Sequence, residues 1–81
     1  MSVRVEVLYF ASLRDAAGIA SEQVDTEAGD PAALYGELQA RHGFGLPRER
    51  LRVAVDGAFA DWQVPLHDGA TVAFIPPVSG G

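Results

Sequence analysis

Hydrophobic and polar residues alternate in several short segments of the chain. The first segment, residues 3–10, is rich in β-branched and aromatic side chains and places Val3, Val5 and Val7 on one face. A period of two with this composition is typical of a β-strand that has one buried face. The same pattern predicts further strands at residues 19–26, 51–55 and 70–75, and a short edge strand or loop at 59–64.

Two segments break the alternation and predict helices. Residues 11–17 favour a short helix that ends at Gly18, and Asp30 can cap a longer helix whose first turn holds Pro31. We expect Gly43 to end the longer helix, because glycine readily adopts the left-handed conformation found just after helix C-termini.

The order of these elements is strand, short helix, strand, main helix and then two or three strands. Strands before and after one long helix can form a single sheet that wraps around it, which predicts an α+β β-grasp (ubiquitin-like) fold. We expect a mixed sheet of four to five strands packed on the main helix within residues 1–75, and a flexible, extended C-terminal Gly-Gly tail at 76–81. A ferredoxin-like split βαβ fold is the alternative, but it needs two comparable helices. The predicted core comprises Val5, Val7, Val53, Val55, Val72 and Phe74, packed against Leu34 and Leu38.

The composition excludes several kinds of chemistry. The 81 residues include no cysteine, which rules out disulfides, thiolate catalysis and thiolate metal sites. His42 and His67 lack metal-ligand spacing, and the sequence has no phosphate-binding glycine loop. The net charge of −5 argues against nucleic acid as a partner and favours a basic patch on a protein. No apolar run approaches the roughly 20 residues of a membrane span and no signal peptide is evident, so we expect a cytoplasmic protein without a membrane partner.

The strongest local feature is the segment Pro76-Pro77-Val78-Ser79-Gly80-Gly81. Two prolines end the last strand and favour an extended exit, because they fix φ and remove two hydrogen-bond donors. Two glycines without Cβ atoms can pass through a narrow channel and leave the Gly81 carboxylate unhindered. Glycines at a chain end are a weak signal alone. The proline stop and the predicted fold strengthen it.

Two stretches carry a family pattern: Leu8-Tyr9-Phe10-Ala11-Ser12-Leu13-Arg14-Asp15, and residues 65–81 with the run Phe74-Ile75-Pro76-Pro77-Val78-Ser79-Gly80-Gly81 at their end. They resemble the first strand with its short helix, and the C-terminal signature, of the MoaD-like sulfur carriers, which are the small subunits of molybdopterin synthase. The resemblance covers nearly the whole chain. Ala70 departs from the pattern, in which an acidic residue is common.

The resemblance implies a mechanism that runs through the tail. An E1-like adenylyltransferase would use ATP to adenylate the Gly81 carboxylate, and sulfur would then replace AMP to leave a thiocarboxylate. The tail would enter the large subunit of molybdopterin synthase, within a heterotetramer, and donate sulfur to cyclic pyranopterin monophosphate. Gly80 would give clearance and Pro76 and Pro77 would aim the tail. The chain itself would bind no cofactor and would not be a catalyst alone.

The same resemblance implies a docking face. Alternation puts Ile75 on the opposite face of its strand from Phe74, and Phe59 can join it there. We expect this face to contact the large subunit and the activating enzyme, together with Pro76, Pro77, Val78 and Ser79. Arg14 is a further candidate contact, and Phe10 and Leu8 can extend the patch. Arg14 can equally be a solvated helix residue without a partner contact. For the strip of Arg48, Arg50 and Arg52, a solvated surface is the preferred interpretation. For Trp62 packing is favoured over recognition.

Three other functions remain open. A sulfur carrier for the thiazole of thiamine shares the fold and the Gly-Gly end, but such carriers commonly lack the segment Phe10–Arg14 and the Pro-Pro-Val-Ser run. A ubiquitin-like modifier would form isopeptide bonds to target lysines, although this chain, which has no lysine, could not form lysine-linked chains on itself. A plain interaction module would carry an inert tail.

Overall fold

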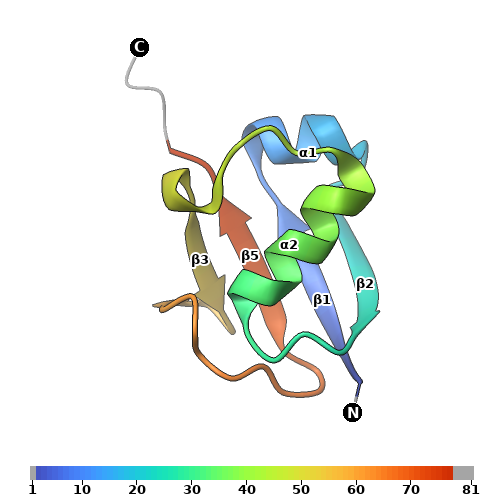
Figure 1. Cartoon of the computed structure of the whole chain (residues 1–81), viewed down its shortest axis with the longest axis vertical. Coiled ribbons are helices and arrows are strands. Elements are labelled where there is room, and N and C mark those ends of the chain that lie inside the picture. The colour runs from blue at the N-terminus through green and yellow to red at the C-terminus, as the bar shows by residue number, and fades with distance from the viewer. Residues whose placement is uncertain (1, 78–81) are drawn as a thin grey trace.

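The computed structural model describes residues 2–77 and shows the predicted order of elements (Figure 1). The 3-10 helix was not predicted from the sequence, and the other boundaries fall within two residues of expectation except at the short edge strand. The elements are β1 (Val3–Tyr9), α1 (Ala11–Ala17), β2 (Ser21–Thr26), α2 (Pro31–His42), the 3-10 helix (Arg48–Arg50), β3 (Arg52–Val55), β4 (Ala58–Ala60) and β5 (Thr71–Ile75).

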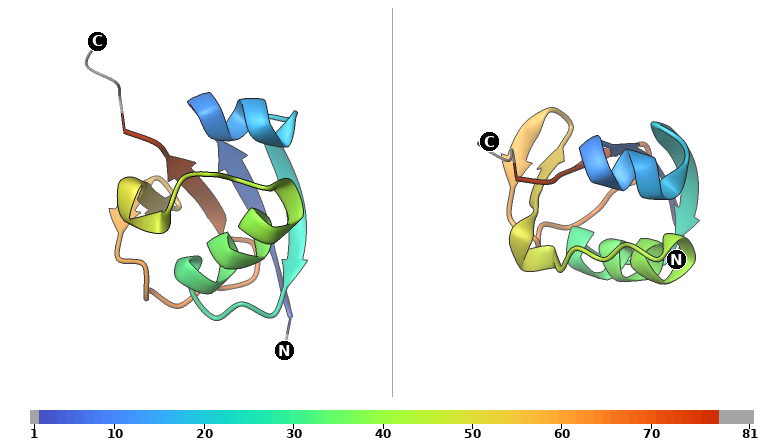
Figure 2. Two further views of the ribbon diagram at one scale, coloured as in Figure 1. Left: turned by 45° about the horizontal axis from the view of Figure 1, so that its top comes forward. Right: turned by 90° about the horizontal axis from the view of Figure 1, so that it is seen from above.

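The strands form one mixed sheet of five, in the order β2-β1-β5-β3-β4. The central pair, β1 and β5, is parallel, and the other three pairs are antiparallel. The curved sheet lies against α2 as a second layer, whereas α1 sits at one end of the sheet (Figure 2). This arrangement confirms the predicted α+β β-grasp fold and excludes the ferredoxin-like alternative.

Residues at both ends of α2 fix where this helix begins and ends. The Asp30 carboxylate accepts a hydrogen bond of 2.9 Å from the Ala33 backbone N–H, which satisfies one of the unpaired donors of the first turn. Pro31 occupies the first helical position, and Gly43 ends the helix with a φ of 74°.

A tight turn joins β3 to the edge strand β4. Asp56 and Gly57 form the two-residue connection with φ values of 54° and 87°, the geometry of a type I′ hairpin. Because that turn matches the twist of the two strands, it fixes their register and pairs Ala54 with Phe59.

The core lies between α2 and the concave face of the sheet. Of the core residues predicted from alternation, Val55 is only half-buried, because it lies next to the exposed turn at the end of β3. Trp62 stacks on Phe74 with 5.9 Å between ring centroids, which confirms its packing role. The others are fully buried: Val5, Val7, Val53, Val72 and Phe74 on the strands, and Leu34 and Leu38 on the helix.

No helix within the described residues 2–77 has the length and apolar character needed to cross a bilayer.

Candidate functional site

The face of the sheet that points away from α2 carries a row of apolar side chains. Strand register places Leu8 opposite Ala73, Ala73 opposite Ala54, and Ala54 opposite Phe59. The row therefore crosses four strands. Leu8 is half-buried, and Phe59 at the edge is 67% exposed, an unusual position for a large aromatic side chain. We call this row and the adjoining Ile75 the open face.

A groove of about 390 Å³ lies where β5 ends and the tail begins. Phe59, Ile75, Pro76 and Pro77 line it together, so the structure brings these four predicted contact residues to one place. Their contact with a partner stays a prediction. Pro76 is buried in the domain and Pro77 is exposed, so Pro76 anchors the root of the tail while Pro77 is the available surface.

Three further predicted contacts, Leu8, Phe10 and Arg14, do not line the groove. Phe10 is 45% exposed at the N-terminal end of α1, and Arg14 is exposed on the same helix. Because β1 and β5 are parallel, α1 and the tail root leave the sheet at the same end (Figure 1). A partner that covers the groove could therefore reach α1 as well.

Four predicted site residues fall outside the described part of the chain: Val78, Ser79, Gly80 and Gly81. What the structure does describe is the route to them. β5 pairs with β1 as far as Phe74 and with β3 as far as Ile75, and Pro76 and Pro77 follow directly. The tail thus begins from a fixed point at one end of the sheet.

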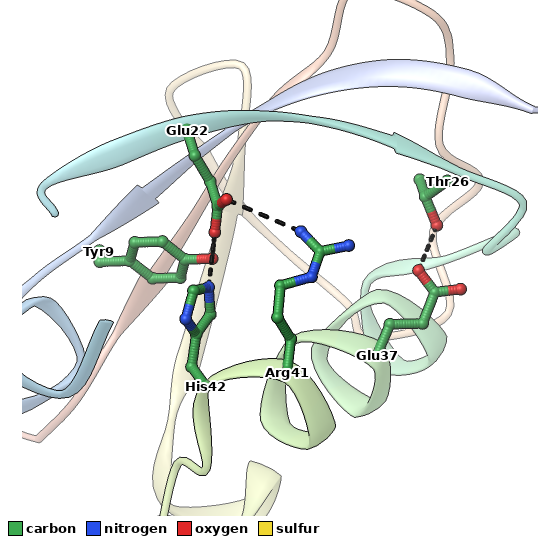
Figure 3. A network of polar contacts seen from close by, with 6 residues as sticks. All are labelled: Tyr9, Glu22, Thr26, Glu37, Arg41 and His42. Atoms are coloured by element: carbon green, nitrogen blue, oxygen red, sulfur yellow. Dashed lines mark hydrogen bonds and ion pairs between the residues drawn. The ribbon is translucent and has the colours of Figure 1, made fainter. Parts of the chain in front are cut away.

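A network of polar side chains links the sheet to the end of α2, and the sequence analysis missed it (Figure 3). The Tyr9 hydroxyl donates to Glu22 Oε2, which also lies 2.7 Å from His42 Nε2. Arg41 Nη1 lies 3.7 Å from the other carboxylate oxygen, Oε1. A single carboxylate therefore joins β1, β2 and α2. The sequence did contain a signal for this network: the period of two in β2 puts Glu22 on the same, buried face of the strand as Val24.

The network shifts the pKa values of two of its members. Burial raises the pKa of Tyr9 well above its ordinary range, and the hydrogen bond to the Glu22 carboxylate raises it further. Burial alone would raise the pKa of Glu22. Hydrogen bonds from Tyr9 and His42, with the charges of His42 and Arg41, outweigh that effect and leave this pKa below its usual range. Glu22 is therefore held as an anion, in a structural role.

We predict that Glu22→Gln lowers the free energy of unfolding at neutral pH by about 1–3 kcal/mol, the range for hydrogen bonds to charged groups. The pKa of Glu22 is lower in the folded chain than in the unfolded one, so its contribution is fully present above the unfolded pKa of roughly 4.3. It is lost as the pH falls through the folded pKa. Urea unfolding followed from pH 7 to pH 3 measures the effect.

The matched control is Glu27→Gln, since Glu27 is an exposed residue just after β2. The control should unfold like the parent chain at every pH. If Glu22→Gln and the parent chain kept a constant difference in unfolding free energy down to pH 3, the carboxylate would not be the source of the stabilisation.

A second pair of ionisable side chains, His67 and Asp56, lies at the surface. His67 Nε2 lies 2.8 Å from Asp56 Oδ2 at the surface, and the Thr71 backbone N–H donates to the same carboxylate. The amide of Thr71 and then His67 lower the pKa of Asp56, and Asp56 in turn raises the pKa of His67. Within the described range, no group of three or more His, Asp or Glu side chains could hold a metal ion.

Comparison with known proteins identifies the family to which the chain belongs. The model of the ThiS family matches residues 7–81. The molybdopterin synthase sulfur carrier subunit of Escherichia coli is 34% identical over 80 residues, covering 95% of this chain and 99% of that protein. The protein of the same name from Mycobacterium tuberculosis is 36% identical over 86 residues, covering 98% and 99%.

Solved structures agree in fold. A chain of the complex of subunits 1 and 2 of the molybdopterin-converting factor from Helicobacter pylori aligns with a TM-score of 0.67 and 28% identity, covering 98% of this chain and 100% of that one. SAMP1 of Haloferax volcanii aligns with a TM-score of 0.78 and 28% identity, covering 96% and 99%. The ubiquitin of Caldiarchaeum subterraneum, with a TM-score of 0.65 and 14% identity over the full length of both chains, supports the fold alone.

Proposed function

Because this chain belongs to the ThiS family and shares about a third of its residues with sulfur carrier subunits over nearly their full length, we propose that it is the sulfur-carrying small subunit of a molybdopterin synthase. The observation that carries the proposal is the match through residue 81, which includes the Gly-Gly segment. The structure supplies the support for that segment: a fixed tail root beside an exposed apolar groove.

The proposed chemistry takes place at the Gly81 carboxylate. One carboxylate oxygen attacks the α-phosphorus of ATP in an E1-like adenylyltransferase, and pyrophosphate leaves. Hydrosulfide released by the sulfur donor then attacks the acyl-adenylate carbon and displaces AMP, and loss of the S–H proton leaves a thiocarboxylate. This product is a sulfur nucleophile that needs no cysteine, and the chain has none. Since the chemistry consumes ATP and a reduced sulfur donor, the cytoplasm is the compartment we propose.

The thiocarboxylate would act within the large subunit. Donation of sulfur to cyclic pyranopterin monophosphate, twice, would build the dithiolene. Catalytic groups would come from the large subunit. Two such carriers on a dimer of large subunits would form the proposed heterotetramer.

The open face and the groove are the surface proposed to dock on both partners. An exposed apolar patch beside the reacting segment is typical of an interaction site. Phe59 and Ile75 would anchor it, Pro77 would extend it toward the tail, and Phe10, Leu8 and Arg14 would meet the partner from the α1 end. The Helicobacter pylori structure, a complex of subunits 1 and 2, supports a large-subunit partner for such a chain.

The experiment that tests the proposal is intact mass spectrometry of the purified chain after incubation with ATP, the adenylyltransferase and a sulfur donor. We expect a mass increase equal to the exchange of one oxygen for one sulfur, and no increase without ATP. If the mass stayed unchanged while a known carrier gained sulfur under the same conditions, the proposal would be wrong.

A protein modifier is the second candidate, because SAMP1, a small archaeal modifier protein, aligns with a higher TM-score (0.78) than the chain from the Helicobacter pylori complex (0.67), at the same 28% identity. The two functions differ in their products. A denaturing gel of cell lysate probed for this chain would show adducts that resist reducing agents if it is a modifier, and a single band if it only carries sulfur. The thiamine thiazole carrier is less favoured, because the segment Phe10–Arg14 and the Pro-Pro-Val-Ser run match the molybdopterin carriers.

A further inference from the structure

Half of the positive side chains of this acidic protein gather beside the tail root. The chain has six arginines and a net charge of −5, and three of the six fall within residues 48–52. Arg50 and Arg52 line the groove that also holds Phe59, Ile75, Pro76 and Pro77. We call the segment that holds Arg48, Arg50 and Arg52 the basic corner.

Aromatic rings hold two of these arginines in place. The guanidinium carbon of Arg52 lies 5.4 Å from the centre of the Phe59 ring, and that of Arg48 lies 5.8 Å from the centre of the Trp62 ring. In such a contact the ring occupies one face of the guanidinium, and the N–H groups at its edge stay available to acceptors.

No carboxylate in the described part of the chain neutralises this corner. The ion pairs within residues 2–77 involve Arg4, Arg41, His42 and His67. Glu49 also lines the groove, but it forms an ion pair with neither Arg50 nor Arg52. With three arginines charged and one glutamate ionised, as is usual at neutral pH, residues 48–52 carry a local charge of about two positive units.

We infer that the face of the large subunit that covers the groove presents carboxylates to Arg50 and Arg52. The inference rests on the proposed function, in which docking buries the groove. Removing a guanidinium from water without a partner is costly, and this chain supplies no described partner. Docking on Phe59 and Ile75 would bring both guanidiniums out of water, so the covering surface must supply the acceptors.

This arrangement gives the docking contact a direction. Apolar contacts alone tolerate sliding, whereas Arg–carboxylate pairs are directional and often bidentate. A basic corner on an acidic carrier also rejects partners that offer basic residues at that place, even where their apolar surfaces fit. The tail would then enter a pocket for an anionic substrate past an acidic rim.

The test is the affinity of Arg50→Gln/Arg52→Gln for the purified large subunit, by isothermal titration calorimetry at low and high salt. We expect about 10–100-fold weaker binding than the parent chain at low salt, as for the loss of two partly buried charge pairs. Parent binding should weaken as salt rises, and the double variant should respond much less. Arg50→Gln alone should account for part of the lost affinity. Arg50 has no aromatic contact of its own, so that part would reflect the lost charge and not a lost contact with a ring.

Arg4→Gln is the matched control. Arg4 lies on the same side of the sheet but near its opposite end, where it pairs with Asp25 in an exposed ion pair. The same charge change there should leave the affinity within about twofold. Circular dichroism should show that every variant is folded, since Arg50, Arg52 and Arg4 are all exposed.

Three outcomes would overturn the inference. The double variant could bind as tightly as the parent chain with the same response to salt, or Arg4→Gln could weaken binding equally. Alternatively, light scattering could show that the parent chain self-associates through the groove and that the double variant does not. Absence of binding by the parent chain itself would instead overturn the proposed function, and this inference with it.

Discussion

A chain that lacks Gly81 is expected to retain its fold and to lose sulfur transfer by at least about 100-fold. The shortened chain still ends in a glycine carboxylate, but that carboxylate falls roughly 3.3–3.6 Å short of its proposed position. Reacting atoms must lie about 3–3.5 Å apart, and a displacement of only 1 Å can cost about 100-fold in rate. Molybdopterin formation in a reconstituted synthase measures the loss.

The control for this deletion is Glu27→Gln, a change at an exposed residue just after β2 that keeps the length and the Gly-Gly end. It should support sulfur transfer near the parent rate. Urea unfolding should be the same for all three chains, because residues 78–81 follow the domain that the structure describes and Glu27 is exposed. Normal transfer by the chain without Gly81 would show that the reacting group lies elsewhere.

The second large effect is expected in the core, where Phe74→Ala should lower the free energy of unfolding by about 3–5 kcal/mol. Phe74 is fully buried and contacts both Trp62 and Tyr35. A domain of this size has a total stability of roughly 4–12 kcal/mol, so the variant would be close to unfolded. Urea unfolding measured by Trp62 fluorescence reports directly on this contact.

Phe59→Ala is the matched control, since it makes the same change at a side chain that is 67% exposed. Its stability should stay within about 0.5 kcal/mol of the parent chain. Its affinity for the large subunit should fall by about tenfold or more if Phe59 is an anchor of the interface. Equal destabilisation by the two variants would mean that Phe59 packs in the core and that the open face is not a docking surface.

The fold was predictable because its signals are local. Alternation located the strands, and Asp30, Pro31 and Gly43 marked the limits of the main helix, since each acts on backbone groups within a few residues of itself. The pairing of β1 with β5 joins residues more than 60 positions apart. It followed only from the order of the elements.

The site was predictable in part. Alternation was enough to place Ile75 on the opposite face of its strand from Phe74, whereas the chemistry expected at the terminal glycine stays a prediction. What the sequence could not show is which separate segments meet. The contact of Arg52 with Phe59 depends on the β3–β4 hairpin, and the network around Glu22 depends on where α2 ends against β2. The burial of Pro76 likewise depends on packing.

The parallel pairing of β1 with β5 also bears on mechanical strength. A partner that draws the tail inward pulls β5 along its own axis, and β5 is hydrogen-bonded on both sides, to β1 and to β3. Such a pull loads both ladders in shear, so many hydrogen bonds must break together, whereas a pull across the strand would open them one at a time. The strand pairing therefore opposes tension applied through the C-terminal end.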